Sequence, residues 1–505
     1  MRLSRNLLAG LANSVWSALV GLAVVPFYLK YLGIEAYGLI GFFTTIQILL
    51  SLLDLGLAPT INREVARCSA SGSMQEARNL LHTLAVVYWV TSGLIALIVI
   101  GGAPFIAKYW LQSKHFPQET ISHAMMLMGV VVACRWPTGL YLGALMGMQR
   151  LTVSSSISIV ATTIGSFGAV AILALVSPTI EAFILWQAGV ALIYSATMRW
   201  AAWAVIGRDG AGKFNVDRLK RIWRFSIGMS GIALSAILLS QLDKIILSKM
   251  LGLAEFGHYM LATTVVSGLN LIIIPMFNTM YPRFSALVAS GDHEKLAELY
   301  RLGTRLQASI LFPMAMVLAV FAEELVHAWT GDPIIAASVA PIITLLAMGS
   351  ALHGMMYFPY ALQLSYGMTR LPLTINLILI IVMVPLIIFL TISRGVLGGA
   401  TAWLVFHILY MTLGTWLTHR HLLKNIGNKW FFQDIGIPLI LSLLVGLVGH
   451  YTIQGTSYPV YMTLMYGGAL ASVAFLLSFI ASPKLCLVLI KNIGRNKHRD
   501  YLNGQ

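Results

Sequence analysis

Long apolar runs alternate with short polar links along most of the sequence. Each run is about 20 residues long, which is enough for an α-helix to cross the hydrocarbon core of a bilayer. The runs are continuous and do not alternate between polar and apolar positions, so they favour helices over a membrane barrel. We therefore predict an all-α integral membrane protein with about 14 transmembrane helices, at residues 7–29, 37–59, 80–102, 121–147, 153–176, 179–203, 224–249, 257–280, 303–322, 336–362, 372–393, 396–418, 435–453 and 459–481.

Composition excludes a soluble fold. The chain has 505 residues, of which 58% are hydrophobic and only 10% charged, whereas soluble proteins carry about 25% charged residues. The first run is too long for a signal-peptide core and no small-residue cleavage site closes it, so we predict a retained span. Cys68, Cys134 and Cys486 show neither metal-ligand nor disulfide spacing. We predict no metal site.

The distribution of Lys and Arg predicts the orientation. Of the 33 basic residues, 26 lie at the termini, in alternate links or at the span ends beside them, and five lie on the opposite side. The positive-inside rule then places both termini in the cytoplasm. The formal net charge of +15 is interpreted as attraction to anionic membrane lipids, and no nucleic-acid partner is expected.

An internal repeat divides the chain. Leu32-Gly33 and Tyr37-Gly38 recur as Leu251-Gly252 and Phe256-Gly257, 219 residues later, and Trp110 recurs at the same offset as Trp329. Both copies start in the cytoplasm, so we predict two parallel six-helix repeats plus two extra C-terminal helices. The predicted domains are an N-terminal half (1–206), a basic cytoplasmic linker (207–223), a C-terminal half (224–420), two appended helices (421–484) and a basic cytoplasmic tail (485–505).

Several motifs occur in an order that resembles a known family. They are Asn13-Ser14 in the first span, Asp54-Leu55-Gly56-Leu57 at the end of the second, Gln241-Leu242-Asp243-Lys244 in the seventh, and Tyr281-Pro282-Arg283-Phe284 after the eighth. With the fourteen-span layout, they make the whole chain similar to the polysaccharide repeat-unit flippases (O-antigen and capsule exporters) of the multidrug/oligosaccharidyl-lipid/polysaccharide exporter superfamily.

This resemblance implies a function. The expected substrate is an undecaprenyl-diphosphate-linked oligosaccharide, moved from the cytoplasmic to the periplasmic leaflet of a bacterial inner membrane by alternating access between the two halves. The expected partners include glycosyltransferases and a polymerase of the same lipopolysaccharide or capsule pathway. No catalytic residue and no cofactor are expected, apart from H⁺ or Na⁺ as a coupling ion.

Charges within the spans indicate where the chemistry lies, because a charge at the bilayer centre costs at least about 2.5 kcal/mol. Arg135 and Lys244 suit a diphosphate or an acidic sugar and are predicted to bind substrate. Asp54 and Asp243 are predicted to couple an ion gradient to transport. Asp243 and Lys244 lie about 100° apart around one helix, so we expect them to face different ways. His353 and His407 are either packed neutral histidines or proton sites.

Three other functions stay open. A Na⁺- or H⁺-coupled multidrug antiporter or a peptidoglycan-precursor flippase of the same superfamily would share this layout. A membrane-embedded polysaccharide-modifying enzyme is a weaker alternative. The longest outer link, 103–120, carries Lys108, Lys114, His115 and Glu119 but no convincing acid–base or nucleophile set.

Overall fold

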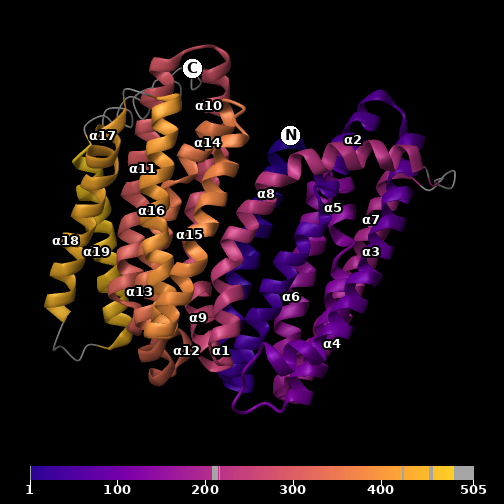
Figure 1. Ribbon diagram of the computed structural model, residues 1–505, viewed down its shortest axis with the longest axis horizontal. Coiled ribbons are helices and arrows are strands. Elements are labelled where there is room, and N and C mark those ends of the chain that lie inside the picture. Colours follow the sequence, from indigo (N-terminus) through magenta and orange to yellow (C-terminus); the bar gives the residue numbers. More distant parts are fainter. Residues whose placement is uncertain (1, 208–213, 215, 424–425, 454–458, 483–505) are drawn as a thin grey trace, which may run out of the picture. The chain divides into compact units, whose positions relative to one another are not determined.

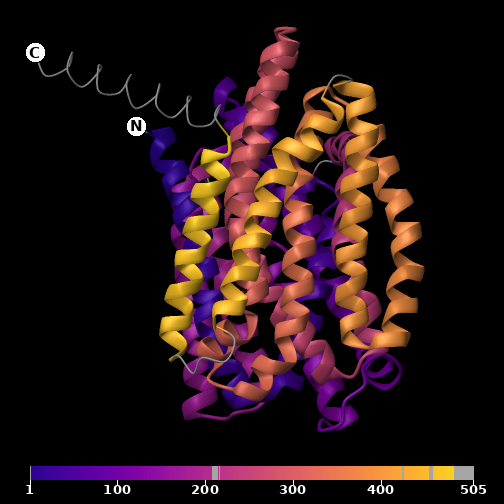
Figure 2. The ribbon, with the colours of Figure 1, turned by 90° about the vertical axis from the view of Figure 1, so that its left-hand side faces the viewer.

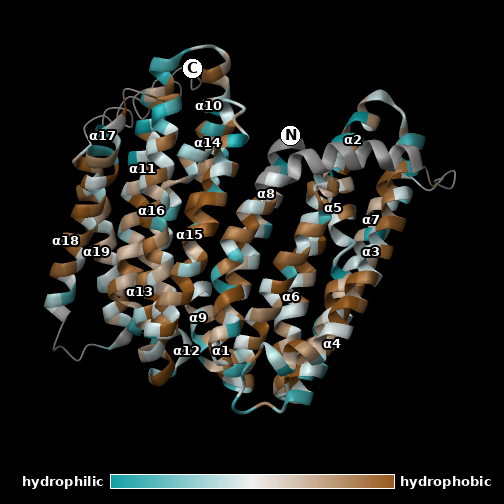
Figure 3. Cartoon of the chain, viewed as in Figure 1, coloured by the Kyte–Doolittle hydropathy of each residue, from teal (hydrophilic) through white to brown (hydrophobic). Residues whose placement is uncertain are grey.

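The computed structural model is built from α-helices over the residues that it describes, which are 2–207, 214, 216–423, 426–453 and 459–482. The helices gather into two compact units, Met1–Met260 and Leu261–Gln505 (Figure 1). Large apolar side chains on the helices face outwards in both units, for example Leu97, Ile98, Phe389 and Ile392. Brown hydrophobic residues fill the middle of most helices, while teal polar residues gather near their ends (Figure 3). Such a surface is suited to lipid rather than to water.

Unit 1 contains helices whose boundaries follow glycines and prolines. α1 is bent at Gly33, whose φ of 79° and ψ of 174° are not helical. Leu55 and Gly56 have positive φ values of 48° and 78°, and they separate a short 3₁₀ turn from α2. The elements are α1 (Arg2–Leu50), η1 (Ser51–Asp54), α2 (Leu57–Ser71), α3 (Met74–Tyr109), α4 (Gln118–Arg135), α5 (Thr138–Gly147), α6 (Leu151–Leu175), α7 (Ile180–Ile206), α8 (Val216–Met250) and α9 (Leu253–Val266), which continues into unit 2.

Unit 2 is a bundle of nearly aligned helices. α18 packs beside α19, and both contact α11, as the turned view shows (Figure 2). The π-helix η3 leads directly into α18. The elements are η2 (Ser267–Leu269), α10 (Asn270–Ala289), α11 (His293–Val320), α12 (Ala322–Thr330), α13 (Pro333–Met355), α14 (Tyr357–Ser365), α15 (Arg370–Arg394), α16 (Val396–Leu422), α17 (Gly427–Lys429), η3 (Trp430–Gly436), α18 (Ile437–Ile453) and α19 (Val460–Ile480).

The predicted all-helical membrane fold is confirmed, but the count of fourteen spans is not. Within the described residues, twelve helical segments are long and apolar enough to cross a membrane. Two predicted spans, 7–29 and 37–59, overlap one segment, Leu8–Asp54, in which two helices meet at the non-helical Gly33. The predicted span 224–249 lies in α8, many of whose side chains are outside the described part of the structure.

The predicted domain boundaries stay predictions. Much of the basic linker 207–223 and the whole tail 485–505 lie outside the described residues. Several pairs of helices that follow each other in the sequence also pack together, for example α3 with α4 and α15 with α16.

Candidate functional site

A cavity of about 310 Å³ in unit 1 brings together two of the four predicted site residues. Asp54 and Arg135 both line it, although 81 positions separate them in the sequence. The other lining residues are Gln47, Ser51, Ala58, Val132, Trp136 and Gly139. One wall therefore comes from the break between α1 and α2, and the other comes from the break between α4 and α5.

Asp54 is held at the first of these breaks. Its carboxylate accepts a hydrogen bond from the backbone N–H of Ala58 at 3.2 Å and another from the Tyr88 hydroxyl of α3. Asp54 is only partly buried. The bond from Ala58, in the first turn of α2, lets Asp54 act as a cap of that helix. Asp54 forms no ion pair with Arg63 or Arg67 among the described residues, and both arginines bind Glu64. The carboxylate is thus anchored by neutral donors at the cavity wall.

Arg135 is the last residue of α4, directly before the Trp136-Pro137 break. Its side chain is exposed to the cavity space, and its Nη2 donates to Oε1 of Gln187 on α7 at 3.3 Å. Gln187 in turn donates from Nε2 to the Gly165 carbonyl at 3.2 Å. Among the described residues Arg135 forms no ion pair within 4.0 Å, and this includes Asp54. A guanidinium oriented by one amide has most of its five donors left for an anion.

The other two predicted residues form a separate, buried cluster on α8. Asp243 is 1% exposed and Lys244 is 8% exposed. The Lys244 ammonium lies 3.3 Å from both carboxylate oxygens of Asp243 and 3.2 Å from the Ser240 carbonyl oxygen. We expected the two side chains to face different ways. The flexible four-carbon stem of Lys244 instead folds its ammonium back onto the neighbouring carboxylate.

Two tyrosines that no sequence pattern indicated complete these carboxylate sites. The Tyr259 hydroxyl of α9 donates to Asp243 Oδ2 at 2.6 Å, as Tyr88 donates to Asp54. Neither tyrosine is charged, and neither occupies a position that spacing alone links to its aspartate. The two aspartates therefore share one arrangement, in which a tyrosine from another helix supplies a neutral donor.

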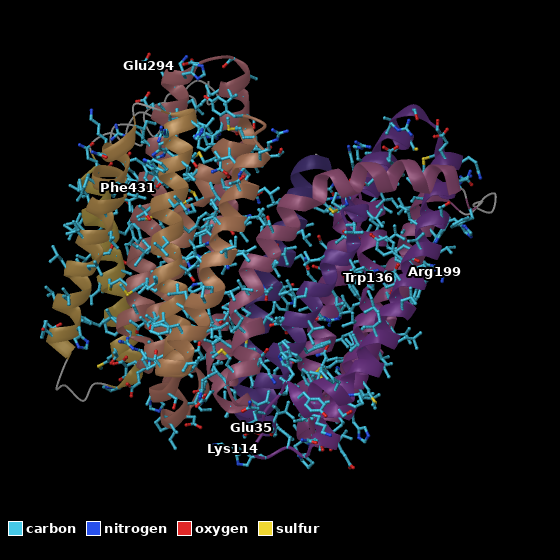
Figure 4. All side chains as sticks on the ribbon, in the orientation of Figure 1. Glu35, Lys114, Trp136, Arg199, Glu294 and Phe431 are labelled. Atoms are coloured by element: carbon cyan, nitrogen blue, oxygen red, sulfur yellow. The ribbon has the colours of Figure 1, made fainter. Side chains whose placement is uncertain are left out.

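The link between α3 and α4 is held to α1 by hydrogen bonds to Glu35. Glu35 is 6% exposed and accepts bonds from the Ser113 hydroxyl at 2.7 Å and from the backbone N–H groups of Lys114 and His115. Figure 4 shows Glu35 and Lys114 together at one end of the unit, whereas Trp136 of the cavity wall lies farther along it. Within the described residues, no group of three or more His, Cys, Asp or Glu side chains is arranged to hold a metal ion.

Comparison with known proteins identifies the family. The family model described as "Polysaccharide biosynthesis protein" matches residues 30–339, which is more than half of the chain. The chain belongs to this family. The succinoglycan biosynthesis transport protein ExoT of Rhizobium meliloti (strain 1021) is 21% identical over 342 residues, which cover 62% of this chain and 63% of ExoT. The matched region is thus less than two thirds of the length of that relative.

Solved structures show the fold of this chain, which is also the fold of transporters in the multidrug/oligosaccharidyl-lipid/polysaccharide (MOP) exporter superfamily. The lipid II flippase MurJ in an inward closed conformation superposes with a TM-score of 0.68 at 13% identity, covering 95% of this chain and 100% of MurJ. An inward-facing multidrug resistance MATE family transporter superposes with a TM-score of 0.66 at 14% identity, covering 80% of this chain and 94% of that one. These two transporters share the predicted helical membrane fold with this chain.

Proposed function

We propose that this protein is a flippase for undecaprenyl-diphosphate-linked oligosaccharide repeat units. It moves them from the cytoplasmic to the periplasmic leaflet of a bacterial inner membrane, with both of its own termini in the cytoplasm. Membership of a polysaccharide biosynthesis family supports a saccharide substrate. The MOP-superfamily fold, which the lipid II flippase MurJ shares, supports transport by alternating access.

The observation that carries the proposal is the position of Arg135. A diphosphate has several anionic oxygens, and a planar guanidinium binds such oxygens through paired, charge-assisted hydrogen bonds. Arg135 lines a cavity, is free of carboxylate partners among the described residues, and is oriented by Gln187. An intramembrane arginine placed in this way needs an anion or water to stabilise its charge, and the substrate diphosphate supplies that anion.

Lys244 is the weaker of the two predicted anion ligands. Its ammonium already lies against Asp243, so it binds a diphosphate only in a conformation that separates this pair. Asp54 is the stronger coupling residue because it is partly exposed at the cavity, whereas Asp243 is buried against Lys244 and Tyr259. We propose that Asp54 exchanges H⁺ or Na⁺ during the transport cycle.

A transport assay in liposomes tests the proposal. The purified protein is reconstituted with a fluorescent polyprenyl-diphosphate oligosaccharide, and the probe in the outer leaflet is removed with an impermeant reagent. We expect the inner pool to become accessible faster with the protein than without it, and Arg135→Ala to reduce this rate at least about 10-fold. Arg135→Lys keeps the charge but loses the paired donors, so an intermediate rate is expected.

Parallel assays separate the alternatives. Lipid II and a cationic dye are offered to the same liposomes, because the fold is shared with MurJ and with multidrug transporters. A rate for lipid II that exceeds the rate for the oligosaccharide would favour the peptidoglycan-precursor flippase. Uptake of the dye together with an immobile lipid-linked sugar would favour the ion-coupled multidrug antiporter.

A further inference from the structure

Two histidines from different helices of unit 2 are hydrogen-bonded to each other. Nε2 of His407 on α16 lies 2.8 Å from Nδ1 of His353 on α13. The rings are nearly perpendicular, with centroids 4.7 Å apart and an interplanar angle of 88°. His407 is 1% exposed, while His353 is only partly buried. The pair lies in the interior of two predicted membrane spans.

A hydrogen bond from His407 to the backbone determines which ring nitrogen of each histidine carries a proton. Nδ1 of His407 lies 2.9 Å from the Trp403 carbonyl oxygen. A carbonyl can only accept, so this Nδ1 carries a proton, and Nε2 of a neutral His407 must then accept. The donor to that Nε2 is Nδ1–H of His353. In the neutral pair, Nε2 of His353 is consequently left with a lone pair, and it makes no hydrogen bond among the described residues.

This geometry limits the pair to one added proton. A proton on Nε2 of His353 leaves the bond between the rings unchanged, since Nδ1–H still donates to His407. A second proton would go to Nε2 of His407, and two N–H groups would then face each other at 2.8 Å between two adjacent cations. Like charges this close oppose double protonation strongly, so the two rings titrate as one unit.

Aromatic rings, rather than carboxylates, surround the pair. His353 lies 5.4 Å from Tyr357 and 6.1 Å from Tyr410, and His407 lies 4.3 Å from Trp403, measured between ring centroids. Aromatic faces stabilise a cation without neutralising it. The Tyr hydroxyls are polar groups that an incoming water can use.

The charged groups of the helices packed on α13 and α16 lie elsewhere. On α11, Arg301 and Arg305 bind Asp434, and Tyr300 bonds with His419. α14 carries no charged residue. The remaining described groups, near helix ends, are His293, Glu294, Lys295 and Glu298 on α11, Glu323, Glu324 and His327 on α12, Arg370 and Arg394 on α15, Arg420 and His421 on α16, and Lys429 on α17.

We propose that His353 and His407 form a one-proton binding site, with Nε2 of His353 as the atom that takes the proton. The site deepens the proposed function, on which its role in coupling rests. A single positive charge between α13 and α16 favours conformations in which water or an anionic group reaches Nε2 of His353, and it disfavours conformations that seal this atom from solvent. A pH gradient thereby biases the conformational equilibrium of a transporter through this pair.

Proton binding is tested without transport. The purified protein in detergent is labelled with ¹⁵N-histidine, and the ring nitrogens are followed by NMR from about pH 3 to about pH 9. We expect the signals of both rings to move together in one single-proton step. His353→Gln abolishes this step, and His407→Asn leaves a lone His353 ring with an altered midpoint. The exposed His123→Asn serves as the matched control and leaves the step unchanged. Two independent steps, or rings that stay neutral throughout, would overturn the proposal.

The coupling role needs a second measurement. Flux of the lipid-linked probe is compared with and without an imposed pH gradient. We expect the gradient to accelerate flux several-fold in wild-type and His123→Asn protein. In His353→Gln, the ratio of flux with the gradient to flux without it should fall to unity. If His353→Gln keeps the wild-type ratio, coupling through the pair is refuted. Loss of flux in wild-type protein under every condition would count against the flippase, whereas the NMR titration would still decide whether the proton site exists.

Discussion

Gly38 and Gly257 lie against each other backbone to backbone. A Cβ atom on Gly38 would come within 2.3 Å of the Leu253 carbonyl oxygen and 3.1 Å of the Gly257 nitrogen. A Cβ atom on Gly257 would come within 2.3 Å of the Ile34 carbonyl oxygen. The two glycines are equivalent positions of the internal repeat, 219 residues apart. The repeated turns therefore pack on each other, and small residues permit this close approach of helices.

Substitution at this contact should reduce stability. We expect Gly38→Ala to lower the free energy of unfolding by about 1–3 kcal/mol, because the opposing atoms are backbone and cannot rotate away. Gly21→Ala is the matched control, since Gly21 lies on the same helix with open space where its Cβ would stand. Unfolding of the purified protein in mixed micelles measures both. Equal stability of the two variants would contradict the contact.

The pair of Asp243 and Lys244 should behave as a coupled unit. Asp243→Asn leaves the buried ammonium of Lys244 without its carboxylate, and we expect the free energy of unfolding to fall by about 3–5 kcal/mol. In the double variant Asp243→Asn/Lys244→Met the free energy of unfolding should fall clearly less, because neither charge remains. Tyr259→Phe removes only one hydrogen bond to a charged group and should lower the free energy of unfolding by about 1.5–3 kcal/mol. The same unfolding assay gives these values, and strict additivity would show that the two charges do not interact.

Asp54 should matter for transport more than for folding. Asp54→Asn keeps an acceptor for one of its two donors, Tyr88 and Ala58, which bind different carboxylate oxygens, and it removes the charge at the cavity. We expect it to reduce ion-driven flux at least about 10-fold while the protein still inserts and folds. Glu64→Gln, which changes a carboxylate on the neighbouring helix α2, is the control. Normal ion-driven flux in Asp54→Asn would remove Asp54 from the coupling role.

Asp434 anchors η3 to α11. It is fully buried and accepts from Arg301 Nε at 2.7 Å, from Arg301 Nη2 at 3.1 Å and from Arg305. Asp434→Asn would leave two guanidinium groups against a neutral side chain, so we expect the free energy of unfolding to fall by about 3–5 kcal/mol. Gln433→Ala, at the exposed neighbouring position, should cost less than about 1 kcal/mol. Similar losses in both variants would argue against the buried ion pair.

A pH effect is expected at the start of α11. Asp292 caps this helix, and the hydrogen bond from the Lys295 side chain lowers the pKa of Asp292 below its ordinary value. A lowered pKa means that the stabilisation is present at neutral pH and is lost as the pH falls through that pKa. Hydrogen exchange at residues 293–297, corrected for the intrinsic rates, should show protection falling in acid. In Asp292→Asn this decrease should disappear.

The apolar runs and the low share of charged residues were enough to predict the helical membrane fold. This prediction succeeded because a bilayer requires each span to satisfy its own backbone hydrogen bonds as a helix. The length of each apolar run in the sequence therefore indicates the length of a span. The twelve segments join the two helices on either side of the Gly33 kink into one, and they do not include α8, many of whose side chains lie outside the described residues.

The site depended on contacts that no local pattern encodes. The sequence marked Asp54, Arg135, Asp243 and Lys244 because charge is costly in a membrane. Only the fold decided that Asp54 and Arg135 share a cavity, that Lys244 is neutralised by its neighbour, and that Tyr88 and Tyr259 bind the two aspartates. Likewise, the bond between His353 and His407 joins residues 54 positions apart. Hydropathy is a property of each segment, whereas pairing of polar groups depends on how helices pack against one another, and only tertiary structure determines that packing.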